Sequence, residues 1–218
     1  MRIEVVRTVE EAGQTLTLRR RDGAHEVLLG NVVLLSSAAL ETERHFGRLA
    51  REISPAGAPP RRVLIGGLGF GATLRGALEV AAPDAEVTVV EKLATVEAWV
   101  RGELAELAQG ALADPRARVD RRDVWDALSE ARDLDAILLD VDNGPEWASF
   151  RSNARLYAPA GLELAKNALR PGGSLAVWSG YPADAFVARL RASGLAARVI
   201  PMEEEGVLRA RAYVGTRG

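Results

Sequence analysis

The stretch RRVLIGGLGFGATLRGALEVAAPDAEVTVVE, residues 61–91, decides the fold. It opens with an apolar run typical of a strand, passes through a glycine-rich turn into a helix-forming segment, and ends with a second apolar strand and a carboxylate. Gly67, Gly69 and Gly71 allow the chain to turn tightly after the first strand and allow a ligand to approach the main chain closely. The order strand, turn, helix, strand predicts a parallel βαβ unit with a ligand site at its turn.

Glu91 ends the second strand of this unit. At this position of a Rossmann-like fold, a carboxylate can accept hydrogen bonds from both hydroxyls of an adenosine ribose. The segment therefore predicts a site for an adenosine-containing cofactor. Because Ala72 follows Gly71, the turn also fits the loose dinucleotide pattern, so a nicotinamide cofactor and S-adenosylmethionine (AdoMet) are both candidates at this point. A purely structural role, in which the glycines allow close helix-strand packing, is the remaining alternative.

The composition indicates a globular protein with a substantial core. The chain has 218 residues, 48% hydrophobic and 27% charged, and a formal net charge of −2, so no global positive field argues for nucleic acid as a partner. It has no cysteine and two histidines, so we expect no disulfide, no thiolate nucleophile and no metal centre. No apolar run approaches the about 20 residues of a membrane helix, and the N-terminus lacks a signal-peptide pattern. We therefore expect a cytoplasmic protein that does not enter a membrane.

The pattern before residue 61 differs from the pattern after it. Residues 2–35 contain short β-like runs separated by glycine-containing turns, which predicts an antiparallel hairpin appendage. A helix is expected over about 36–53, and a proline-containing segment then ends it. We predict two domains, an N-terminal β-strand appendage with its connecting helix over 1–53 and a Rossmann-like domain over 61–218.

Strand and helix patterns alternate from residue 61 onward, which predicts a parallel sheet with helices on both faces. The last two β-like runs, LAARVIPM and VLRARAYVG, are separated only by residues 203–206. This connection is too short for a crossover helix, so the two runs should form an antiparallel hairpin. A nicotinamide domain ordinarily continues in parallel, whereas class I AdoMet-dependent methyltransferases end this way. The predicted fold class is therefore α/β, with a mainly parallel seven-stranded sheet, an antiparallel final strand and a small N-terminal antiparallel domain.

Several motifs, taken in order over most of the chain, resemble those of the spermidine synthase (polyamine aminopropyltransferase) family. LLGNVVLLSS and ETERHFGRLA resemble the family's N-terminal strand motif and the helix that follows it, and GGLGFGATLR resembles its glycine motif. VTVVEK resembles the ribose strand, RRDVWDAL the adenine segment, DVDNGP the segment of catalytic carboxylates, and LYAPAGLELAKNALRPGGSLAVWS the family's ending. The chain is thus identified as a divergent member of this family, within the class I AdoMet-dependent superfamily.

The resemblance implies a set of donor-binding residues at or after the predicted strand ends: Gly67, Gly69, Phe70, Gly71, Glu91, Asp123 and Val124. The glycines would cradle the donor, Glu91 would hold its ribose, and Asp123 with Val124 would contact the adenine. Asp140 would be the catalytic residue, because a carboxylate at a strand end can orient or deprotonate an amine beside a sulfonium carbon. A helix cap at Asp123 and a turn role for Asp140 remain alternatives.

The departures from the family pattern concern the groups that would bind a polyamine. The family's aspartate that pairs with the amine of decarboxylated AdoMet falls on Phe70, or on Gly69 if the motif is aligned from its other end. The family's N-terminal glutamine falls on Val33, and the spacing after Asp140 is one residue shorter. A polyamine needs several acidic or aromatic partners. The candidates for this substrate role, each with a loop or core role as its alternative, are Asp142, Glu146, Trp147, Tyr157 and Trp178.

Three functions are compatible with these residues. The main expectation is methyl transfer from AdoMet to a small-molecule acceptor, because Phe70 leaves no carboxylate for a donor ammonium. The first alternative is a polyamine aminopropyltransferase that uses decarboxylated AdoMet, with Asp142 or Glu146 replacing the missing carboxylate. The second is a non-catalytic nucleotide-binding or structural member. A nicotinamide oxidoreductase comes last, because no Tyr-x-x-x-Lys proton-relay pair is evident. The resemblance also implies a homodimer formed through the N-terminal strands.

Overall fold

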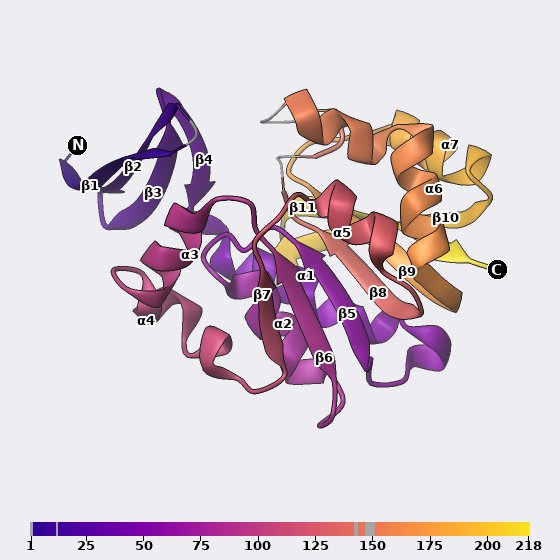
Figure 1. The fold of residues 1–218 in the computed structure, drawn as a ribbon. Helices are drawn as coiled ribbons and strands as arrows, with labels where there is room; N and C mark the ends of the chain where they lie inside the picture. The colour runs from indigo at the N-terminus through magenta and orange to yellow at the C-terminus, as the bar shows by residue number, and fades with distance from the viewer. Residues whose placement is uncertain (1, 12, 142–143, 147–150) are drawn as a thin grey trace.

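The computed structural model describes residues 2–11, 13–141, 144–146 and 151–218, which form two separate sheets (Figure 1). The N-terminal sheet is antiparallel, with strand order β1-β2-β3-β4. Its strands are β1 Ile3–Glu11, β2 Gln14–Arg21, β3 Ala24–Leu29 and β4 Val32–Ser36. Alternation along β2 buries Leu16 and Leu18 completely, so one face of this sheet packs on the rest of the molecule.

The main sheet has seven strands in the order β10-β11-β9-β8-β5-β6-β7. Its strands are β5 Arg62–Gly66, β6 Glu86–Val90, β7 Ala117–Asp120, β8 Leu134–Leu139, β9 Leu169–Ser179, β10 Leu195–Glu204 and β11 Val207–Arg217. β5 to β9 run parallel, and β11 is antiparallel to both β9 and β10. The predicted fold class, with its closing antiparallel hairpin, is confirmed.

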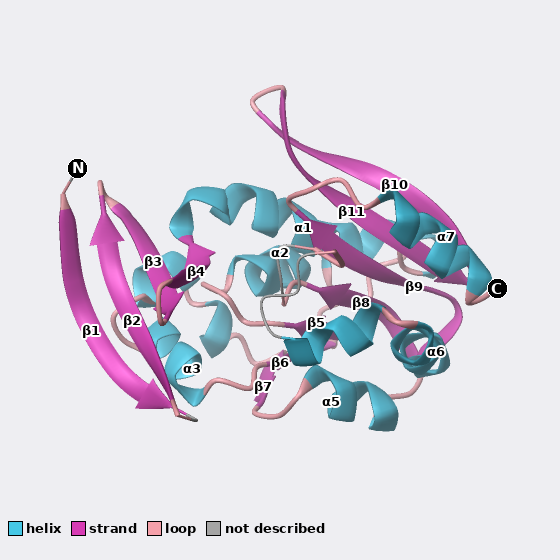
Figure 2. Ribbon diagram, turned by 90° about the horizontal axis from the view of Figure 1, so that it is seen from above, coloured by secondary structure: helices cyan, strands magenta, loops and turns pink. Residues whose placement is uncertain are grey.

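Helices cover both faces of the main sheet (Figure 2). They are α1 Leu40–Glu52, α2 Ala72–Val80, α3 Ala94–Arg101, α4 Ala105–Ala108, α5 Val124–Glu130, α6 Pro159–Ala168 and α7 Asp184–Ala192. The first three helices and the N-terminal sheet share one core with one face of the sheet, and α5, α6 and α7 share a second core with the other face. All six residues of β8 are buried, as a central parallel strand requires. No helix in the described part of the chain is long and apolar enough to cross a membrane.

The N-terminal sheet is fixed to the main domain by a carboxylate at the end of β1. Glu11 Oε1 accepts a hydrogen bond from Ala94 N at 2.8 Å, and Glu11 Oε2 accepts one from Thr95 N at 3.0 Å. These two N–H groups lie in the first turn of α3 and have no hydrogen-bond partner within the helix, so the Glu11 carboxylate satisfies them. Its negative charge also interacts favourably with the positive end of the helix dipole. The domain boundaries, 1–53 and 61–218, remain predictions.

The helices α1 and α2 pack unusually closely because each carries a glycine at the contact. A Cβ atom on Gly47 would lie 2.1 Å from the carbonyl oxygen of Thr73, and a Cβ atom on Gly76 would lie 2.0 Å from that of Arg44. Any larger residue at either position would push the helices apart. This contact holds the N-terminal half of α1 beside the start of α2.

Candidate active site

The carboxyl ends of β5 and β8 mark the point where the winding of the sheet reverses. β6 and β7 lie on one side of β5, whereas β8 and β9 lie on the other. In open α/β sheets, ligands bind in the crevice at this point. A cavity lies here, with an empty volume of about 630 Å³ that includes space open to solvent. Six of the predicted site residues line it: Gly67, Gly69, Glu91, Asp123, Val124 and Asp140.

The glycine-rich turn closes tightly against the end of β8. Gly67 has φ +91°, and a Cβ atom on it would lie 2.3 Å from the carbonyl oxygen of Asp140. Gly67 N donates to Val90 O at 2.9 Å, and Asp140 N donates to Gly66 O at 2.9 Å, so the turn is tied to both neighbouring strands. Gly71 does not line the cavity. It precedes α2 and allows close packing on Ala108, so its predicted contact with the donor is not supported by its position.

Glu91 joins the glycine-rich turn to the loop after β6. Its Oε2 accepts a hydrogen bond from Leu68 N at 3.1 Å, and its Oε1 accepts one from Leu93 N at 2.8 Å. Burial raises the pKa of Glu91, although these N–H donors partly offset the rise. Each carboxylate oxygen can accept a further hydrogen bond, so the arrangement leaves acceptor capacity for two ribose hydroxyls.

Asp123 has two roles in the structure. Its Oδ1 caps α5 by accepting a hydrogen bond from Trp125 N at 2.8 Å, which is the role given above as the alternative. Arg155 Nη2 lies 3.0 Å from the same oxygen, and the Arg155 guanidinium stacks 4.9 Å from the centre of the Trp125 ring. Since Asp123 also lines the cavity beside Val124, the capping role does not exclude contact with an adenine.

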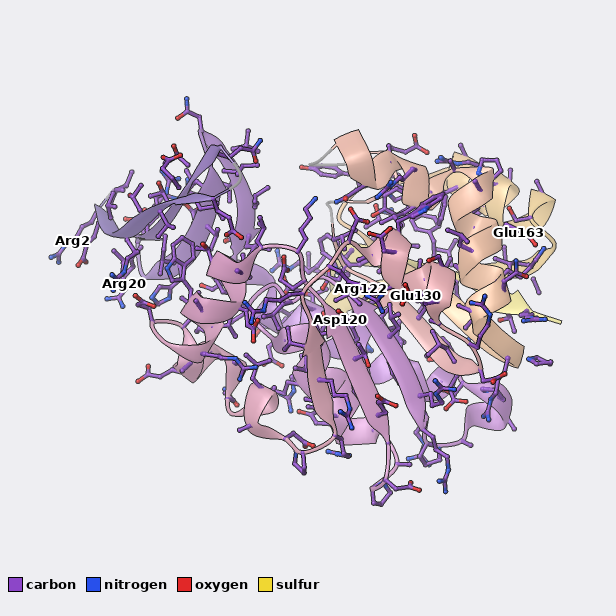
Figure 3. The ribbon with its side chains drawn as sticks, in the orientation of Figure 1. Arg2, Arg20, Asp120, Arg122, Glu130 and Glu163 are labelled. Carbon is purple, nitrogen blue, oxygen red and sulfur yellow. The ribbon has the colours of Figure 1, made fainter. Side chains whose placement is uncertain are left out.

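Arg122 also lines the cavity, but its charge is neutralised outside it. Its Nε lies 2.6 Å from Asp120 Oδ2, and its Nη1 lies 2.5 Å from Glu130 Oε2 (Figure 3). The guanidinium is therefore held between the end of β7 and the end of α5.

Asp140 is partly exposed and lies beside the helices α1 and α2. Its Oδ2 accepts a hydrogen bond from Thr73 Oγ1 at 2.6 Å, and Thr73 Oγ1 lies 3.3 Å from the carbonyl oxygen of Glu43. Burial raises the pKa of Asp140 to about 6, although the Thr73 hydroxyl opposes the rise. Burial and the charge of Asp140 raise the pKa of Glu43 well above its usual range. Two carboxyl groups, from β8 and α1, therefore lie close enough to influence each other's ionisation.

Glu43 was not predicted from the sequence, although a signal for it exists. It lies on the same stripe of α1 as the buried residues Phe46, Gly47 and Ala50, at helical spacing. A carboxylate on the apolar stripe of an amphipathic helix is unusual, because burying an unpaired charge is costly, and Glu43 is only partly buried.

Several predicted site residues lie elsewhere. Phe70 is 1% exposed and belongs to the core on the α1 side, so it does not line the cavity. Tyr157 is also buried, with its ring 6.0 Å from Phe186 in the core on the opposite face, and is therefore not placed to bind an acceptor. Glu146 is exposed and pairs with Arg189. Because an apolar or aromatic side chain gains most by burial, packing determined the positions of Phe70 and Tyr157.

The remaining three predicted substrate residues divide into two groups. Asp142 and Trp147 lie outside the described residues. Trp178 is half-buried on β9 and packs against the core on the α1 side. Leu139 pairs with Val177 in the β8–β9 register, so Asp140 and Trp178 follow at the same level of neighbouring strands. The Nε1 atom of Trp178 is buried and has no hydrogen-bond acceptor among the described residues.

The curated proteins that resemble this chain in sequence share one name, polyamine aminopropyltransferase. No protein-family model matches the chain. It is 38% identical over 130 residues to polyamine aminopropyltransferase 1 of Hyperthermus butylicus, covering 57% of this chain and 42% of that protein. It is 35% identical over 148 residues to polyamine aminopropyltransferase 2 of Pseudomonas aeruginosa, covering 66% of this chain and 40% of that protein. The match thus spans about two fifths of the length of these curated relatives.

The solved structures agree with the sequence relatives. The crystal structure of spermidine synthase from Thermotoga maritima superposes with a TM-score of 0.70 at 18% identity, covering 97% of this chain and 72% of that one. A spermidine synthase in complex with the transition-state analogue AdoDATO gives the same TM-score and covers 98% of this chain. These relatives favour the aminopropyl alternative over methyl transfer, which they do not support. The chain is therefore similar in sequence to the polyamine aminopropyltransferases and in fold to the spermidine synthases.

Proposed function

We propose that the chain transfers an aminopropyl group from decarboxylated AdoMet to an amine acceptor. The observation that carries this proposal is Asp140, which follows β8 and lines the cavity. AdoMet carries a carboxylate and an ammonium on its amino acid portion, whereas decarboxylated AdoMet carries the ammonium alone. An ionised carboxyl group of the protein repels the carboxylate of AdoMet and attracts the ammonium of either donor. The effect is strong where water is excluded.

No basic side chain among the described residues offsets this acidic character. The pKa of Asp140 is shifted by burial and by the Thr73 hydroxyl, and the pKa of Glu43 by burial and by Asp140, with no contribution from a lysine or arginine. The basic residues that line the cavity, Lys92 and Arg122, follow β6 and β7 instead. A carboxylate on the donor would therefore find no counter-charge near Asp140, and this supports the decarboxylated donor.

The residues that line the cavity have different roles in the proposed reaction. The glycine-rich turn and Glu91 hold the nucleoside, and Asp123 with Val124 borders its base. Asp140 accepts a hydrogen bond or a proton from the acceptor amine, whose lone pair then attacks the propyl carbon next to the sulfonium. The new C–N bond forms as the C–S bond breaks, methylthioadenosine leaves as a neutral thioether, and the proton passes through Asp140 to solvent.

A calorimetric titration of the wild-type protein ranks the donors. We expect decarboxylated AdoMet to bind most tightly and methylthioadenosine to bind less tightly, because it lacks the ammonium. AdoMet should bind weakest, because Asp140 repels its carboxylate. Tighter binding of AdoMet than of decarboxylated AdoMet would contradict the proposal and restore methyl transfer. NAD serves as the control, and we expect it to show no binding.

The acceptor is proposed only as an amine, since the loop that follows β8 contains the predicted substrate residues that lie outside the described part of the chain. The homodimer also stays a prediction. Exposed apolar side chains on the N-terminal sheet support it: Ile3, Val5, Val6 and Val32.

A further inference from the structure

We propose that Asn153 binds the adenine base of the donor through its side-chain amide, at the edge of the base that carries N6 and N7. The inference rests on the proposed function and assigns within it a residue that determines specificity for the base. Asn153 was not among the site residues predicted from the sequence. It belongs to η4 Arg151–Tyr157, a 3₁₀ helix that follows β8 and precedes α6.

Asn153 is a buried polar residue in the wall of the cavity. It is 7% exposed and lines the cavity together with Asp123, Val124 and Val141. Among the described residues that line this cavity, it is the only one with an uncharged polar side chain. Burying a polar group costs free energy unless the group is hydrogen-bonded. A side-chain amide offers two N–H donors and a carbonyl acceptor, so it can bind a ligand in addition to a group of the protein.

Two contacts hold η4 against the start of α5. Arg155 Nη2 lies 3.0 Å from Asp123 Oδ1, so the helix is tied to the residue that caps α5. The next residue, Leu156, is 2% exposed and belongs to the same apolar core as Val124. These contacts fix the position of η4 in the folded protein. Asn153 therefore lies at the end of the cavity where Asp123 and Val124 border the base.

Asp123 and Val124 together suit one edge of an adenine. Asp123 Oδ1 caps α5 and pairs with Arg155, whereas Oδ2 accepts no hydrogen bond from the part of the chain that the structure describes. This second oxygen can accept one of the two hydrogens of the N6 amine. Val124 N, at the first position of α5, has no acceptor within the helix and can donate to N1. The other N6 hydrogen and N7 then remain for a group on the opposite side.

The side-chain amide of an asparagine matches this remaining edge. Its carbonyl accepts from the N6 amine while its NH₂ group donates to N7, which is the bidentate pairing that asparagine makes with adenine in nucleic acids. One exocyclic amine can serve Asp123 and Asn153 at once, because it carries two N–H donors. A base with an oxygen at this position offers no donor to the carboxylate or to the amide carbonyl. The pair therefore selects for adenine.

A ligand that lacks N7 tests the assignment without any change to the protein. 5′-Methylthio-7-deazaadenosine carries C–H in place of N7 and keeps the exocyclic amine, the ribose and the methylthio group. In calorimetric titrations we expect the wild type to bind it about 10-fold more weakly than methylthioadenosine, because the buried N–H of Asn153 loses its acceptor.

The variant Asn153→Leu removes the amide and keeps the size of the side chain similar. We expect it to weaken methylthioadenosine about 10-fold and to bind the two nucleosides within about twofold of each other, because no donor faces N7. The variant Asn153→Asp can only accept near neutral pH, so it should bind the 7-deaza nucleoside at least as tightly as methylthioadenosine. The matched control Asn167→Leu changes an exposed asparagine on α6 and should keep the wild-type ratio of the two affinities.

The outcomes separate this inference from the proposed function. If the wild type binds the two nucleosides equally, Asn153 does not bind N7 and the inference is overturned, although the nucleoside site stands. If Asn153→Leu and Asn153→Asp bind more weakly but keep the wild-type preference for methylthioadenosine, the role of Asn153 is structural and the inference is likewise overturned. If the wild type binds neither nucleoside, the proposed function fails together with this inference.

Discussion

The variant Asp140→Asn is expected to lose nearly all aminopropyl transfer while becoming more stable than the wild type. An asparagine can still accept the hydrogen bond from Thr73, so the geometry of the site is kept. It cannot take a proton from the acceptor amine, and a positioned general base contributes about 10²- to 10⁴-fold to a rate. We expect kcat to fall by that factor, with the binding of methylthioadenosine unchanged.

The gain in stability follows from the direction of the pKa shift. Burial raises the pKa of Asp140 to about 6 from an ordinary value of 3.8, so the folded protein holds this proton more tightly than the unfolded chain does. Stability from this group is present at acid pH and is lost as the pH rises from about 4 through about 6. At pH 8 the ionised carboxylate costs about 2 kcal/mol, a value reduced by its exposure to the cavity. Removing the charge should therefore raise the free energy of unfolding by about that amount.

Denaturant unfolding at pH 5 and pH 8, with rate measurements on the same samples, checks both halves of this prediction. The wild-type kcat/KM should decline below pH 6 as Asp140 becomes protonated. Asp126→Asn, an exposed change on α5, is the control and should leave rate and stability as they are. An Asp140→Asn protein that retains more than a tenth of the wild-type rate would show that Asp140 is not the base.

The variant Glu91→Gln is expected to weaken every nucleoside ligand by about 100-fold, whether or not the ligand carries an ammonium. The carboxylate accepts hydrogen bonds from Leu68 N and Leu93 N through its two different oxygens, and a glutamine can accept through only one. One of these N–H groups loses its partner, and the ribose loses a charged acceptor. Hydrogen bonds to a charged group contribute about 1.5–3 kcal/mol each, which accounts for the expected loss.

Titration with methylthioadenosine measures this effect without interference from the reaction. The control is Glu86→Gln, at the opposite end of the same strand, where the carboxylate is half exposed and pairs with Arg118 at 3.2 Å. We expect Glu86→Gln to bind like the wild type. Equal binding by Glu91→Gln and the wild type would mean that the ribose does not lie at Glu91.

The parts of the site that could be predicted from sequence are those fixed by local structure. Gly67 and Glu91 each follow a strand directly, and the parallel sheet brings their strand ends together whatever the rest of the chain does. The closing hairpin was also predictable from local sequence, because the connection between β10 and β11 is too short to contain a crossover helix. Asp140 was predictable as the end of a fully buried strand.

Other features depend on contacts between elements distant in sequence. Phe70 belongs to a motif that is expected to face a ligand, but its aromatic ring joins the core on the α1 side, where it is 1% exposed. The close approach of α1 to α2 depends on Gly47 and Gly76, which lie on different helices, and no local pattern predicts that pairing. Local structure therefore predicts which residues follow the strand ends, whereas tertiary packing determines which side chains surround them.

Product analysis tests the central claim most directly. The wild-type protein is incubated with decarboxylated AdoMet or with AdoMet, each with a panel of diamines and polyamines, and the small molecules are identified by mass spectrometry. The account predicts one methylthioadenosine and one aminopropylated amine per turnover from decarboxylated AdoMet, and no product from AdoMet. A methylated acceptor with S-adenosylhomocysteine, formed from AdoMet, would contradict it.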